Sequence, residues 1–525
     1  MKLRIAKPYL TFRTHENAPL RRMCLWQKGR LMAEYQIHFT GSWEGFPVWL
    51  DVRRFCGQDV EVEITPELNV DFGQEEEMEI PDLYREDLRP QIHFSVKTGW
   101  NNDPNGMIFL QGQYHMYYQY GPCSTRWNNM HWGHAVSKDL IHWEEKPCAL
   151  CPGPDGMPFS GNAVLDQENR TGLGKAALFF YTATGTGFTL EEGGKGFTQH
   201  LAYIPGDEEE MRLYDKNPVL PHICDGNRDP FVIFCEELGD YLMALYHEGE
   251  EFGLYRSGDL LHWERFQTLK LKGDEECPNV YPLCTREGVR KWIFTGAHDI
   301  YVVGSFQEGR FVVEQEPIPL SFGGIIYASQ WIANLEDRTV RVAYEQLGIP
   351  SPRFSQQLGI PTEMRLIQNG EQYFLTALPV PEIKTLCVRE ICEKDLKLSG
   401  GELWEIPVEG PAADVEVRFL GQPAGTAVIS LLGVEMCLAF SQNSFCMEGV
   451  TAPLSRTGRA PRLRAVVDRC SVEVFLDDGA VLAVARCNAH VGKSWFGIQG
   501  DTSLYVEFLC CQSLASIWDT SGGKS

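Results

Sequence analysis

Three acidic residues lie in short motifs that could place a carboxylate at a binding surface. Asp103 lies within Trp-Asn-Asn-Asp-Pro-Asn-Gly at positions 100–106, Asp229 within Arg-Asp-Pro, and Glu276 at the start of Glu-Cys-Pro. When carboxylates share a partly buried pocket, repulsion and desolvation separate their pKa values, so one stays ionised while another holds a proton. Glycoside hydrolysis needs this combination of a nucleophile or base and a general acid.

A divalent cation site is the alternative use for clustered carboxylates, because calcium and magnesium prefer oxygen ligands. The motifs favour hydrolysis, since proline follows both aspartates and the sequence has no Asp-x-Asp-x-Asp loop. Cys148 and Cys151 form a single CxxC pair without the second pair of a zinc site. We therefore predict neither a metal nor a cofactor.

Five aromatic-rich strand signals could bring the acidic motifs together. They recur at intervals of roughly 50 to 65 residues, as expected for repeated units of several strands. They occupy residues 114–120, 177–182, 241–247, 291–296 and 340–346. Five such units predict a five-bladed β-propeller. Two near copies, Ser-Lys-Asp-Leu-Ile-His-Trp-Glu at 137–144 and Ser-Gly-Asp-Leu-Leu-His-Trp-Glu at 257–264, are interpreted as scaffold turns.

A different polar motif precedes each of the five strand signals. The motifs occupy residues 102–106, 159–161, 228–230, 276–278 and 327–330. Equivalent positions in successive blades lie around one axis, so we expect the motifs to converge at the mouth of the central channel. Because Asp-Pro and Asn-Gly are turn dipeptides, we expect Asp103 on a turn at the edge of a strand.

The regions on either side of the predicted propeller, 88–380, also have β patterns. Short apolar runs predict a small additional N-terminal β domain at 1–73, and the acidic residues that follow indicate a linker at 74–87. The runs occupy residues 9–12, 32–39, 47–52 and 60–64. We find no residues with an evident chemical role in this N-terminal domain.

Strand patterns spaced by roughly 8 to 12 residues predict a C-terminal β-sandwich at 381–520. The predicted strands are 414–420, 426–432, 436–440, 462–467, 471–476, 481–485, 494–498 and 504–509. A tail at 521–525 is expected to be disordered. The whole chain is therefore expected to be all-β.

The composition limits the classes of partner. The chain has 71 acidic and 47 basic residues, and its net charge of −24 disfavours contact with phosphate backbones and anionic lipid. No apolar run is long enough for a membrane span, and Met1–Pro8 has no signal-peptide pattern, so we expect a cytoplasmic protein. The 17 cysteines are scattered, and several, including Cys235, Cys437, Cys510 and Cys511, lie in apolar runs, which indicates reduced thiols.

Six motifs together resemble glycoside hydrolase family 32, the β-fructofuranosidases. They are Trp-Asn-Asn-Asp-Pro-Asn-Gly from 100, Tyr-Gln-Tyr from 118, Trp-Asn-Asn-Met-His-Trp-Gly-His-Ala-Val-Ser from 127, Phe-Ser-Gly from 159, Arg-Asp-Pro from 228 and Glu-Cys-Pro from 276. Their order and spacing match the family, and the resemblance covers roughly residues 88–520. It implies a five-bladed propeller followed by a β-sandwich, and retention of configuration at a fructosyl anomeric carbon.

The resemblance also implies roles for the three acidic residues. Asp103 would be the nucleophile, Glu276 the general acid/base, and Asp229 the residue that hydrogen-bonds fructose hydroxyls in the transition state. The neighbouring residues agree with these roles, because the Asn102 amide could hold Asp103 ionised and the charge of Glu275 could raise the pKa of Glu276. The preference for Glu276 over Glu275 comes from the family motif.

Further residues are predicted to contact the substrate. Gln119, Trp127, Phe159 and Ser160 match family positions that contact the fructosyl unit, although Phe159 could equally pack in the core. Arg228 could clamp Asp229 and a sugar hydroxyl, with a plain salt bridge as the alternative. The fifth motif adds Tyr327.

The segment around the fifth motif departs from the family. Ser321 and Ile325 stand where the family usually has aspartates, and we expect this change to alter the rim of the pocket and the preference for the leaving group. Trp331 is predicted to form an aromatic wall there, with core packing as the alternative.

We therefore predict a retaining glycoside hydrolase that cleaves β-fructofuranosyl linkages in sucrose or short fructo-oligosaccharides through a covalent fructosyl-enzyme intermediate. A fructosyltransferase with the same three carboxylates and a non-catalytic carbohydrate-binding propeller are the alternatives. The expected partner is a small carbohydrate, with no nucleic acid and no membrane. The sequence leaves a homo-oligomer open.

Overall fold

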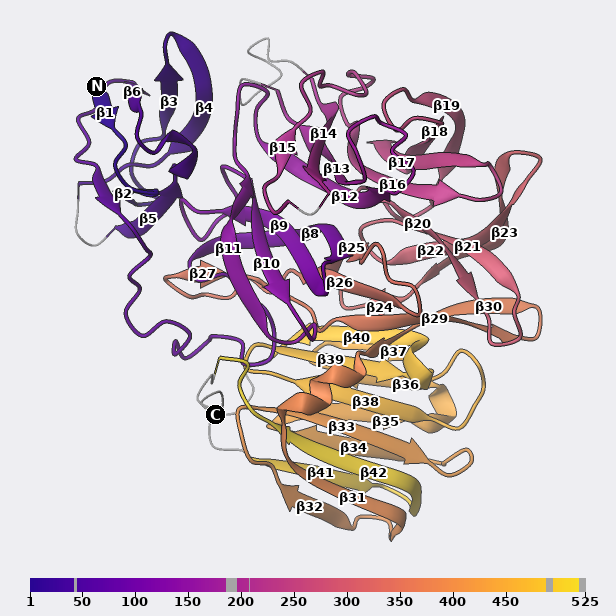
Figure 1. The fold of residues 1–525 in the computed structure, drawn as a ribbon. Coiled ribbons are helices and arrows are strands. Elements are labelled where there is room, and N and C mark those ends of the chain that lie inside the picture. The colour runs from indigo at the N-terminus through magenta and orange to yellow at the C-terminus, as the bar shows by residue number, and fades with distance from the viewer. Residues whose placement is uncertain (42–44, 186–195, 207, 488–493, 519–525) are drawn as a thin grey trace.

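The chain folds almost entirely into β-strands (Figure 1). The computed structural model describes residues 1–41, 45–185, 196–206, 208–487 and 494–518, so the tail predicted at 521–525 lies outside the described residues. The helices found in these ranges are short 3₁₀ segments: η1 (Arg53–Phe55), η3 (Pro381–Leu386), η4 (Phe440–Gln442) and η5 (Asp477–Gly479). None of the described helices is long and apolar enough to cross a membrane.

Two small sheets form the N-terminal part of the molecule. Their strands are β1 (Lys2–Arg4), β6 (Asp59–Thr65), β3 (Arg21–Gln27) and β4 (Arg30–Ile37) in one sheet, and β5 (Phe46–Asp51), β2 (Tyr9–Thr14) and β7 (Gly73–Glu75) in the other. One apolar cluster, which includes Leu10, Met23, Tyr35 and Leu50, holds them together. Strand β7 pairs with β2 through Glu75, so the N-terminal sheets extend two residues into the predicted linker.

The middle of the described chain contains five antiparallel sheets built from successive strands. In sequence order they are β8 (Gly99–Leu110), β9 (Gln113–Gly121), β10 (His131–Ser137) and β11 (Trp143–Leu150); β12 (Pro158–Asp166), β13 (Ala176–Ala183), β14 (Thr198–Pro205) and β15 (Arg212–Leu213); β16 (Arg228–Cys235), β17 (Asp240–Glu248), β18 (Glu251–Ser257) and β19 (Glu264–Lys270); β20 (Asn279–Cys284), β21 (Arg290–Thr295), β22 (Ile300–Gln307) and β23 (Arg310–Pro319); and β25 (Ile326–Trp331), β26 (Thr339–Glu345), β29 (Thr362–Asn369) and β30 (Gln372–Pro379). Figure 1 shows these sheets following one another around a common centre, as in a β-propeller.

The first strand of each sheet faces that centre, where β12 contacts both β8 and β16, and β25 contacts β8. The five aromatic-rich signals of the sequence are the second strands, β9, β13, β17, β21 and β26. These strands are apolar because the sheets pack face to face; in β13 all eight residues are buried. Two short strands, β27 (Phe354–Ser355) and β28 (Gln357–Leu358), join β8 and β26, respectively.

The predicted turn at Asp103 is wrong, because residues 100–106 lie inside strand β8. The pairing of β8 with β9 is interrupted twice, between Asn101 and Pro104 and between Asn105 and Ile108. Such β-bulges accommodate proline and glycine inside a strand and turn side chains away from the regular alternation. The turn-forming residues therefore make bulges rather than a reversal of the chain.

The two near-identical segments near 139 and 259 form the same turn, as their interpretation as scaffold predicts. Asp139 accepts hydrogen bonds from the backbone N–H groups of Ile141 and His142 at 3.0 and 2.8 Å, and from the His142 ring at 2.8 Å. Asp259 binds the backbone of Leu261 and His262 and the His262 ring in the same way. Each aspartate thus fixes the connection between the third and fourth strands of its sheet.

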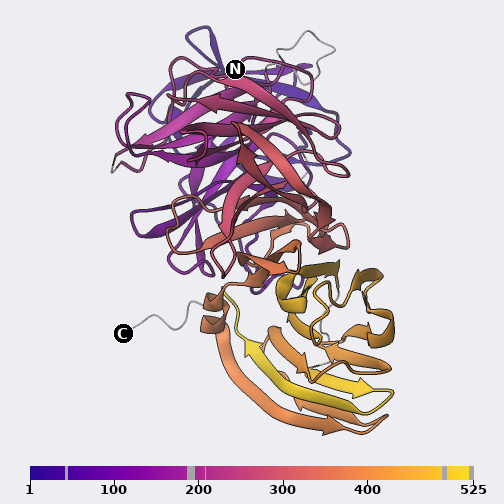
Figure 2. The ribbon, with the colours of Figure 1, turned by 90° about the vertical axis from the view of Figure 1, so that its right-hand side faces the viewer.

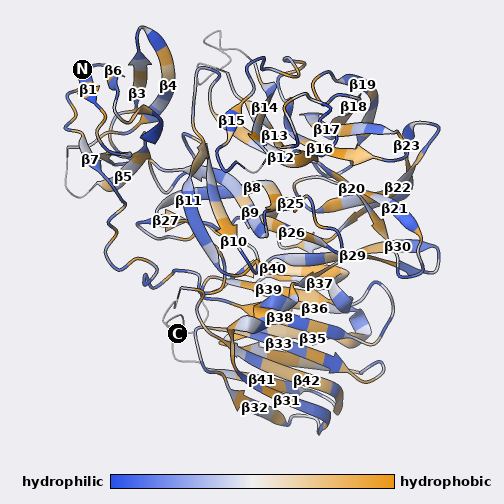
Figure 3. Ribbon diagram, viewed as in Figure 1, coloured by the Kyte–Doolittle hydropathy of each residue, from blue (hydrophilic) through white to orange (hydrophobic). Residues whose placement is uncertain are grey.

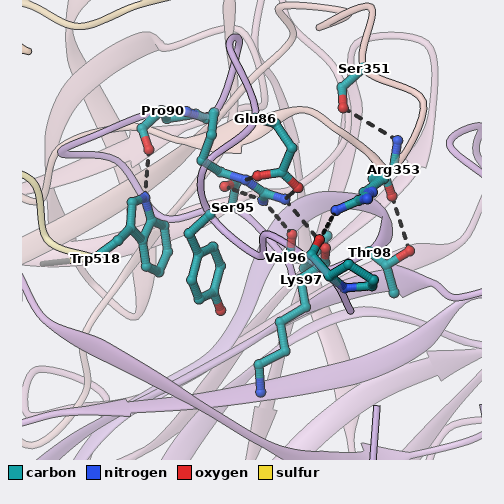
Figure 4. Close-up of polar contacts among 12 residues, drawn as sticks. Glu86, Pro90, Ser95, Val96, Lys97, Thr98, Ser351, Arg353 and Trp518 are labelled. Carbon is teal, nitrogen blue, oxygen red and sulfur yellow. Dashed lines mark hydrogen bonds and ion pairs between the residues drawn. The ribbon is translucent and has the colours of Figure 1, made fainter. Parts of the chain in front are cut away.

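The segment before β8 is held by a buried arginine and by polar contacts with distant parts of the chain. Arg89 is fully buried and donates to Glu86, to Ser95 and to the Val96 carbonyl. Figure 4 shows neighbouring contacts, in which Trp518 donates to the Pro90 carbonyl at 2.6 Å and Thr98 donates to the Arg353 carbonyl at 3.0 Å. These bonds tie the segment to both the last sheet of the propeller and the C-terminus.

The C-terminal part is a sandwich of two sheets. One contains β24 (Ser321–Phe322), β40 (Val481–Arg486), β39 (Ser471–Leu476), β38 (Arg462–Val467), β33 (Ala412–Phe419), β42 (Leu504–Leu514) and β31 (Cys387–Leu398), and the other β32 (Leu403–Pro407), β41 (Trp495–Gly500), β34 (Thr426–Leu431), β35 (Val434–Ala439), β36 (Ser444–Met447) and β37 (Val450–Pro453). Strands β34 and β35 alternate buried and more exposed residues, and apolar and polar segments alternate along the strands of this region in Figure 3. The two sheets enclose one large apolar cluster.

The sandwich lies at one end of the molecule and the N-terminal sheets toward the other (Figures 1 and 2). Strand β24 leaves the propeller and pairs in parallel with β40, through Ser321 and Leu482. A disulfide joins Cys392 to Cys510 across β31 and β42. The prediction that the cysteines are reduced is therefore wrong for this pair.

Candidate active site

A pocket of about 780 Å³ opens where the first strands of the propeller sheets meet. It is lined by ten of the residues predicted from the sequence: Asn102, Asp103, Gln119, Trp127, Phe159, Ser160, Arg228, Asp229, Glu276 and Tyr327. They come from β8, β9, β12, β16 and β25 and from the connections before β10 and β20. The structure therefore brings the three acidic residues into one site.

Irregular backbone aims these side chains into the pocket. The strand pairings shift between Pro158 and Gly161, between Arg228 and Phe231, and between Tyr327 and Gln330, at the same stage of each first strand. Asp229 and Glu276 have positive φ angles of 61° and 53°. Such conformations cost roughly 1–3 kcal/mol each and cluster at functional sites.

Asp103 is buried, and two side chains donate hydrogen bonds to its carboxylate. Ser160 Oγ donates to Oδ2 at 2.6 Å, and Asn102 Nδ2 donates to Oδ1 at 3.0 Å. Trp100 Nε1 donates to Asn102 Oδ1 at 2.8 Å and so orients the amide. Burial raises the pKa of Asp103, and the donors from Ser160 and Asn102 oppose that rise without cancelling it. The expected support from Asn102 is present, but the pKa lies above its usual value.

Asp229 lies beside Asp103 and shares a thiol with it. Cys277 Sγ lies 3.4 Å from Asp229 Oδ2 and 3.6 Å from Asp103 Oδ2, so its single proton can serve one carboxylate at a time. The backbone N–H of Cys277 also donates to Asp229, at 3.2 Å. Burial, together with the negative charges of Glu276 and Asp103, raises the pKa of Asp229 to about 7, although Arg228 opposes the shift. Carboxylates of the site thus differ in how readily they ionise.

Glu276 is more accessible, and both of its carboxylate oxygens are engaged. Arg228 Nη2 donates to Oε1, and the Tyr327 hydroxyl donates to Oε2 at 2.5 Å. Glu275, which we expected to act on Glu276, is exposed and does not line the pocket, within the part of the chain that the structure describes. The geometry therefore selects Glu276 over Glu275 as the acidic residue of this segment.

Arg228 forms salt bridges and lines the pocket at the same time. Its guanidinium lies over the Tyr246 ring at 4.6 Å and contacts both Glu276 and Asp229, the latter at 3.8 Å. The two predicted uses of Arg228, as a salt bridge and as part of the binding surface, are thus compatible.

Aromatic side chains form one wall of the pocket. Trp127 is 46% exposed, and its ring meets that of Phe159 edge to face at 5.9 Å. Phe159 in turn contacts Phe197 at 5.7 Å. Gln119 is buried beneath them and donates to the Pro158 carbonyl at 3.1 Å. An accessible indole face beside a polar floor suits a sugar ring, which presents C–H groups on one face and hydroxyls at its edge.

Three residues from the fifth segment do not line this pocket, among the residues described. Trp331 is 6% exposed and contributes instead to a second cavity of about 480 Å³ that is lined by later residues of the first strands. The prediction of an aromatic wall at Trp331 is therefore wrong, because Trp331 lies at the end of β25 beyond the bulge. Ser321 pairs with the sandwich and Ile325 packs in the core, so they do not form the rim as expected.

Other residues that line the pocket were not identified from the sequence. Trp100 stands inside the motif that contains Asp103, and Tyr344 lies on β26, the second strand of the fifth sheet. Glu34 comes from β4 of the N-terminal sheets, for which we had expected no chemistry. Nothing in the local sequence around Glu34 indicates that it reaches the pocket.

The chain matches two models of one protein family. The first is described as glycosyl hydrolases family 32 N-terminal domain and covers residues 93–376. The second is described as glycosyl hydrolases family 32 C terminal and covers residues 434–487. The first match alone spans more than half of the chain.

Characterised relatives agree with this match. The chain is 30% identical to a levanase from Bacillus subtilis over 498 residues, which cover 83% of this chain and 72% of the relative. It is 30% identical to a fructan beta-fructosidase from Streptococcus mutans over 485 residues, or 80% of this chain and 32% of that longer protein. The crystal structure of exo-inulinase from Aspergillus awamori superposes with a TM-score of 0.74 at 25% identity, covering 83% of this chain and all of that chain.

These matches confirm the predicted all-β fold, a propeller followed by a β-sandwich. The fold gathers the three acidic residues into one pocket. The chain belongs to glycosyl hydrolases family 32 and is a glycosidase that acts on fructosides.

Proposed function

We propose that the protein hydrolyses terminal β-fructofuranosyl linkages of sucrose and fructo-oligosaccharides with retention of configuration. The observation that carries the proposal is the convergence of Asp103, Asp229 and Glu276 in one pocket, each with a different set of hydrogen-bond partners. A retaining mechanism needs a nucleophile and a separate residue that acts as an acid in the first step and as a base in the second.

In the first step Asp103 attacks the anomeric carbon of the fructosyl unit. The donors Ser160 and Asn102 fix its two oxygens and favour the ionised form that attacks. Glu276 gives a proton to the oxygen of the departing sugar, so the glycosidic bond breaks as the bond to Asp103 forms. In the second step Glu276 takes a proton from water, which attacks the same carbon and releases fructose and the Asp103 carboxylate.

Asp229 is proposed to bind hydroxyl groups of the fructosyl unit rather than to react. Its backbone N–H donates to Thr182 at 2.9 Å, and its carboxylate is held by Cys277, so its position is fixed before substrate binds. Hydrogen bonds to ring hydroxyls that strengthen as positive charge develops on the ring would stabilise the transition state.

The relatives support fructosides as the class of substrate. Proteins named levanase, fructan beta-fructosidase and extracellular exo-inulinase share 30 to 32% identity with matched parts of this chain. We infer that the fructosyl unit is the recognised part and that the leaving unit is either another sugar of a short chain or the glucose of sucrose.

Methanol in the reaction tests the stereochemistry directly. The enzyme is incubated with sucrose and with 1-kestose in the presence of methanol, and the methyl fructofuranoside that forms is identified by carbon NMR. Transfer from a covalent intermediate gives the methyl β-fructofuranoside. Formation of the α-anomer would refute the double displacement.

The same reaction without methanol separates hydrolysis from the two alternatives. With concentrated sucrose, a hydrolase releases equal amounts of fructose and glucose, whereas a fructosyltransferase releases more glucose than fructose. A non-catalytic carbohydrate-binding propeller would release neither sugar. The presence of all three carboxylates argues against this last alternative.

A further inference from the structure

The N-terminal sheets lie outside both matched family segments, 93–376 and 434–487, yet they contribute to the pocket. The residue that reaches it is Glu34 on β4, which is 8% exposed. Two parallel bonds from Arg22, Nε to Oε1 at 2.9 Å and Nη2 to Oε2 at 2.8 Å, fix the orientation of the carboxylate. Each carboxylate oxygen can accept a further hydrogen bond, so Glu34 remains able to bind a hydroxyl.

Strand β4 is fastened to the loop that carries Trp127. The backbone N–H of Gln36 donates to Asn129 Oδ1 at 2.8 Å, and the Gln36 carbonyl accepts from Asn129 and Asn128 at 2.7 and 3.1 Å. Tyr35 stacks on His131 with ring centroids 6.0 Å apart. The residues that follow Trp127 are therefore held by the strand that presents Glu34.

A second loop of the pocket is also in contact with the N-terminal sheets. Arg54 donates to the Pro152 carbonyl at 2.9 Å, and the next residues, Gly153, Gly156 and Met157, line the pocket. Farther from the pocket, Thr14 Oγ1 donates to the buried Cys123 carbonyl at 2.7 Å. These contacts make the N-terminal sheets a fixed wall of the site rather than a tethered module.

The position of this wall indicates which part of the substrate it meets. Asp103 and Asp229 are 9% and 6% exposed and form the floor, where the fructosyl carbon must lie, whereas Trp127 is 46% exposed and marks the mouth. The loops held by the N-terminal sheets are those at the mouth. A sugar departing from the anomeric carbon toward solvent passes this part of the pocket.

We propose that the N-terminal sheets complete the binding site for the leaving sugar, and that Glu34 accepts hydrogen bonds from its hydroxyl groups. A carboxylate with its geometry fixed by Arg22 can accept from two neighbouring hydroxyls of a glucosyl or fructosyl unit. The inference rests on the proposed hydrolysis of fructosides, and it assigns the choice of leaving group to a part of the chain outside the family segments.

The test compares substrates that differ only in the leaving group. Methyl β-fructofuranoside, sucrose and 1-kestose carry the same fructosyl unit, and only the last two have a leaving sugar. For Glu34→Gln and Glu34→Ala, kcat/KM should fall about tenfold with sucrose and 1-kestose, mainly through KM, because a hydrogen bond to a charged group is lost. With methyl β-fructofuranoside, kcat/KM should stay within about twofold of wild type.

The matched control is Glu61→Gln, an exposed glutamate on β6 of the same sheet, which should leave all three substrates unaffected. Arg22→Met supplies a second variant, in which Glu34 is kept but no longer oriented. Its kcat/KM should fall less than that of the Glu34 variants, and only with sucrose and 1-kestose. An equal loss with all three substrates, or no loss with any, would overturn the inference. Wild-type protein that releases no fructose from any of the three would instead refute the proposed function.

Discussion

Tyr327 donates a hydrogen bond of 2.5 Å from its hydroxyl to Oε2 of Glu276, while Arg228 occupies the other oxygen of the same carboxylate. Glu276 is thus held between a neutral donor and a cation, from two different sheets of the propeller. In the proposed mechanism this carboxyl group gives a proton in one step and takes one in the next, which needs a fixed direction, and this pair of contacts supplies it.

Replacing Tyr327 by phenylalanine should weaken this positioning. We expect kcat/KM for sucrose to fall by about tenfold, since a hydrogen bond to an ionisable group is removed while the ring is retained. Steady-state kinetics with sucrose would measure the loss. Tyr203→Phe on β14, outside the pocket lining among the described residues, is the control; equal kcat/KM values for wild type and Tyr327→Phe would contradict the prediction.

Ser160→Ala should shift the acidic limb of the activity profile. The Ser160 hydroxyl opposes the rise in the pKa of Asp103 that burial causes, so its removal raises that pKa further. Asp103 must be ionised to attack, and activity should therefore be lost at a higher pH on the acidic side. The measurement is kcat/KM against pH, with Ser430→Ala on β34 of the sandwich as control. A limb that stays in place or moves to lower pH would show that Ser160 does not support the ionised form.

The variants Asp103→Asn and Glu276→Gln should each lose at least about a thousandfold in kcat, because each removes one of the two groups that react in the proposed mechanism. Thermal unfolding should remain close to wild type, since both replacements keep the shape of the side chain. Asp337→Asn, at an exposed position, controls for the loss of one negative charge. Turnover at the wild-type rate by either active-site variant would remove that residue from the mechanism.

A buried ion pair links the segment before the propeller to the sandwich, and it should make stability depend on pH. His93 Nδ1 lies 2.8 Å from Asp468 Oδ2, and Asp468 also accepts from the backbone of Gln91 and Ile92. Burial alone lowers the pKa of His93, but Asp468 and Glu473 outweigh it and hold the pKa well above its usual value. The stabilisation is therefore fully present below about pH 6.5, the unfolded value, and is lost as pH rises through the folded pKa.

Glu345 also makes the protein less stable as pH rises. Burial and Glu473 raise its pKa, so the folded state keeps this proton to a higher pH than the unfolded chain does. The free energy of unfolding, measured by urea denaturation from pH 6 to 10, should fall with rising pH. Asp468→Asn should cost about 3–5 kcal/mol at pH 6.5, since it removes the nearer of the two carboxylates that pair with the buried charge of His93. Asp71→Asn, on the exposed surface, is the control. Stability that rises from pH 7 to 10 would contradict the assignment.

Much of this fold follows from local patterns in the sequence. Strands β38 and β39 begin and end at the predicted residues, because alternating or continuous apolar runs are bounded there by charged and turn-forming residues. By contrast, β31 has the sequence Cys-Val-Arg-Glu-Ile-Cys-Glu-Lys-Asp-Leu-Lys-Leu, in which charges obscure the pattern. It is an edge strand with mostly exposed side chains, so burial does not impose an apolar face on it.

The pocket could be predicted where motifs recur at equivalent stages of a repeated unit, as for Asp103, Asp229 and Glu276. The sequence leaves Trp331 open between a pocket wall and core packing, and the structure packs it in a buried apolar cluster. The period of a strand does not reveal on which side of a bulge a side chain will lie. Glu34 could not be predicted, since its place depends on contacts between β4 and loops near 128 and 152. Contacts between residues this far apart leave no periodic signal in one sequence.

The bulged first strands of the propeller sheets have a consequence for how this enzyme can change. At the bulges, side chains that line the pocket leave the regular alternation of the strand pairing. A substitution there alters the shape or charge of the pocket while the sheets behind it remain paired and packed. New preferences among sugars can thus arise by single replacements at the pocket lining while the paired and packed sheets behind it stay unchanged.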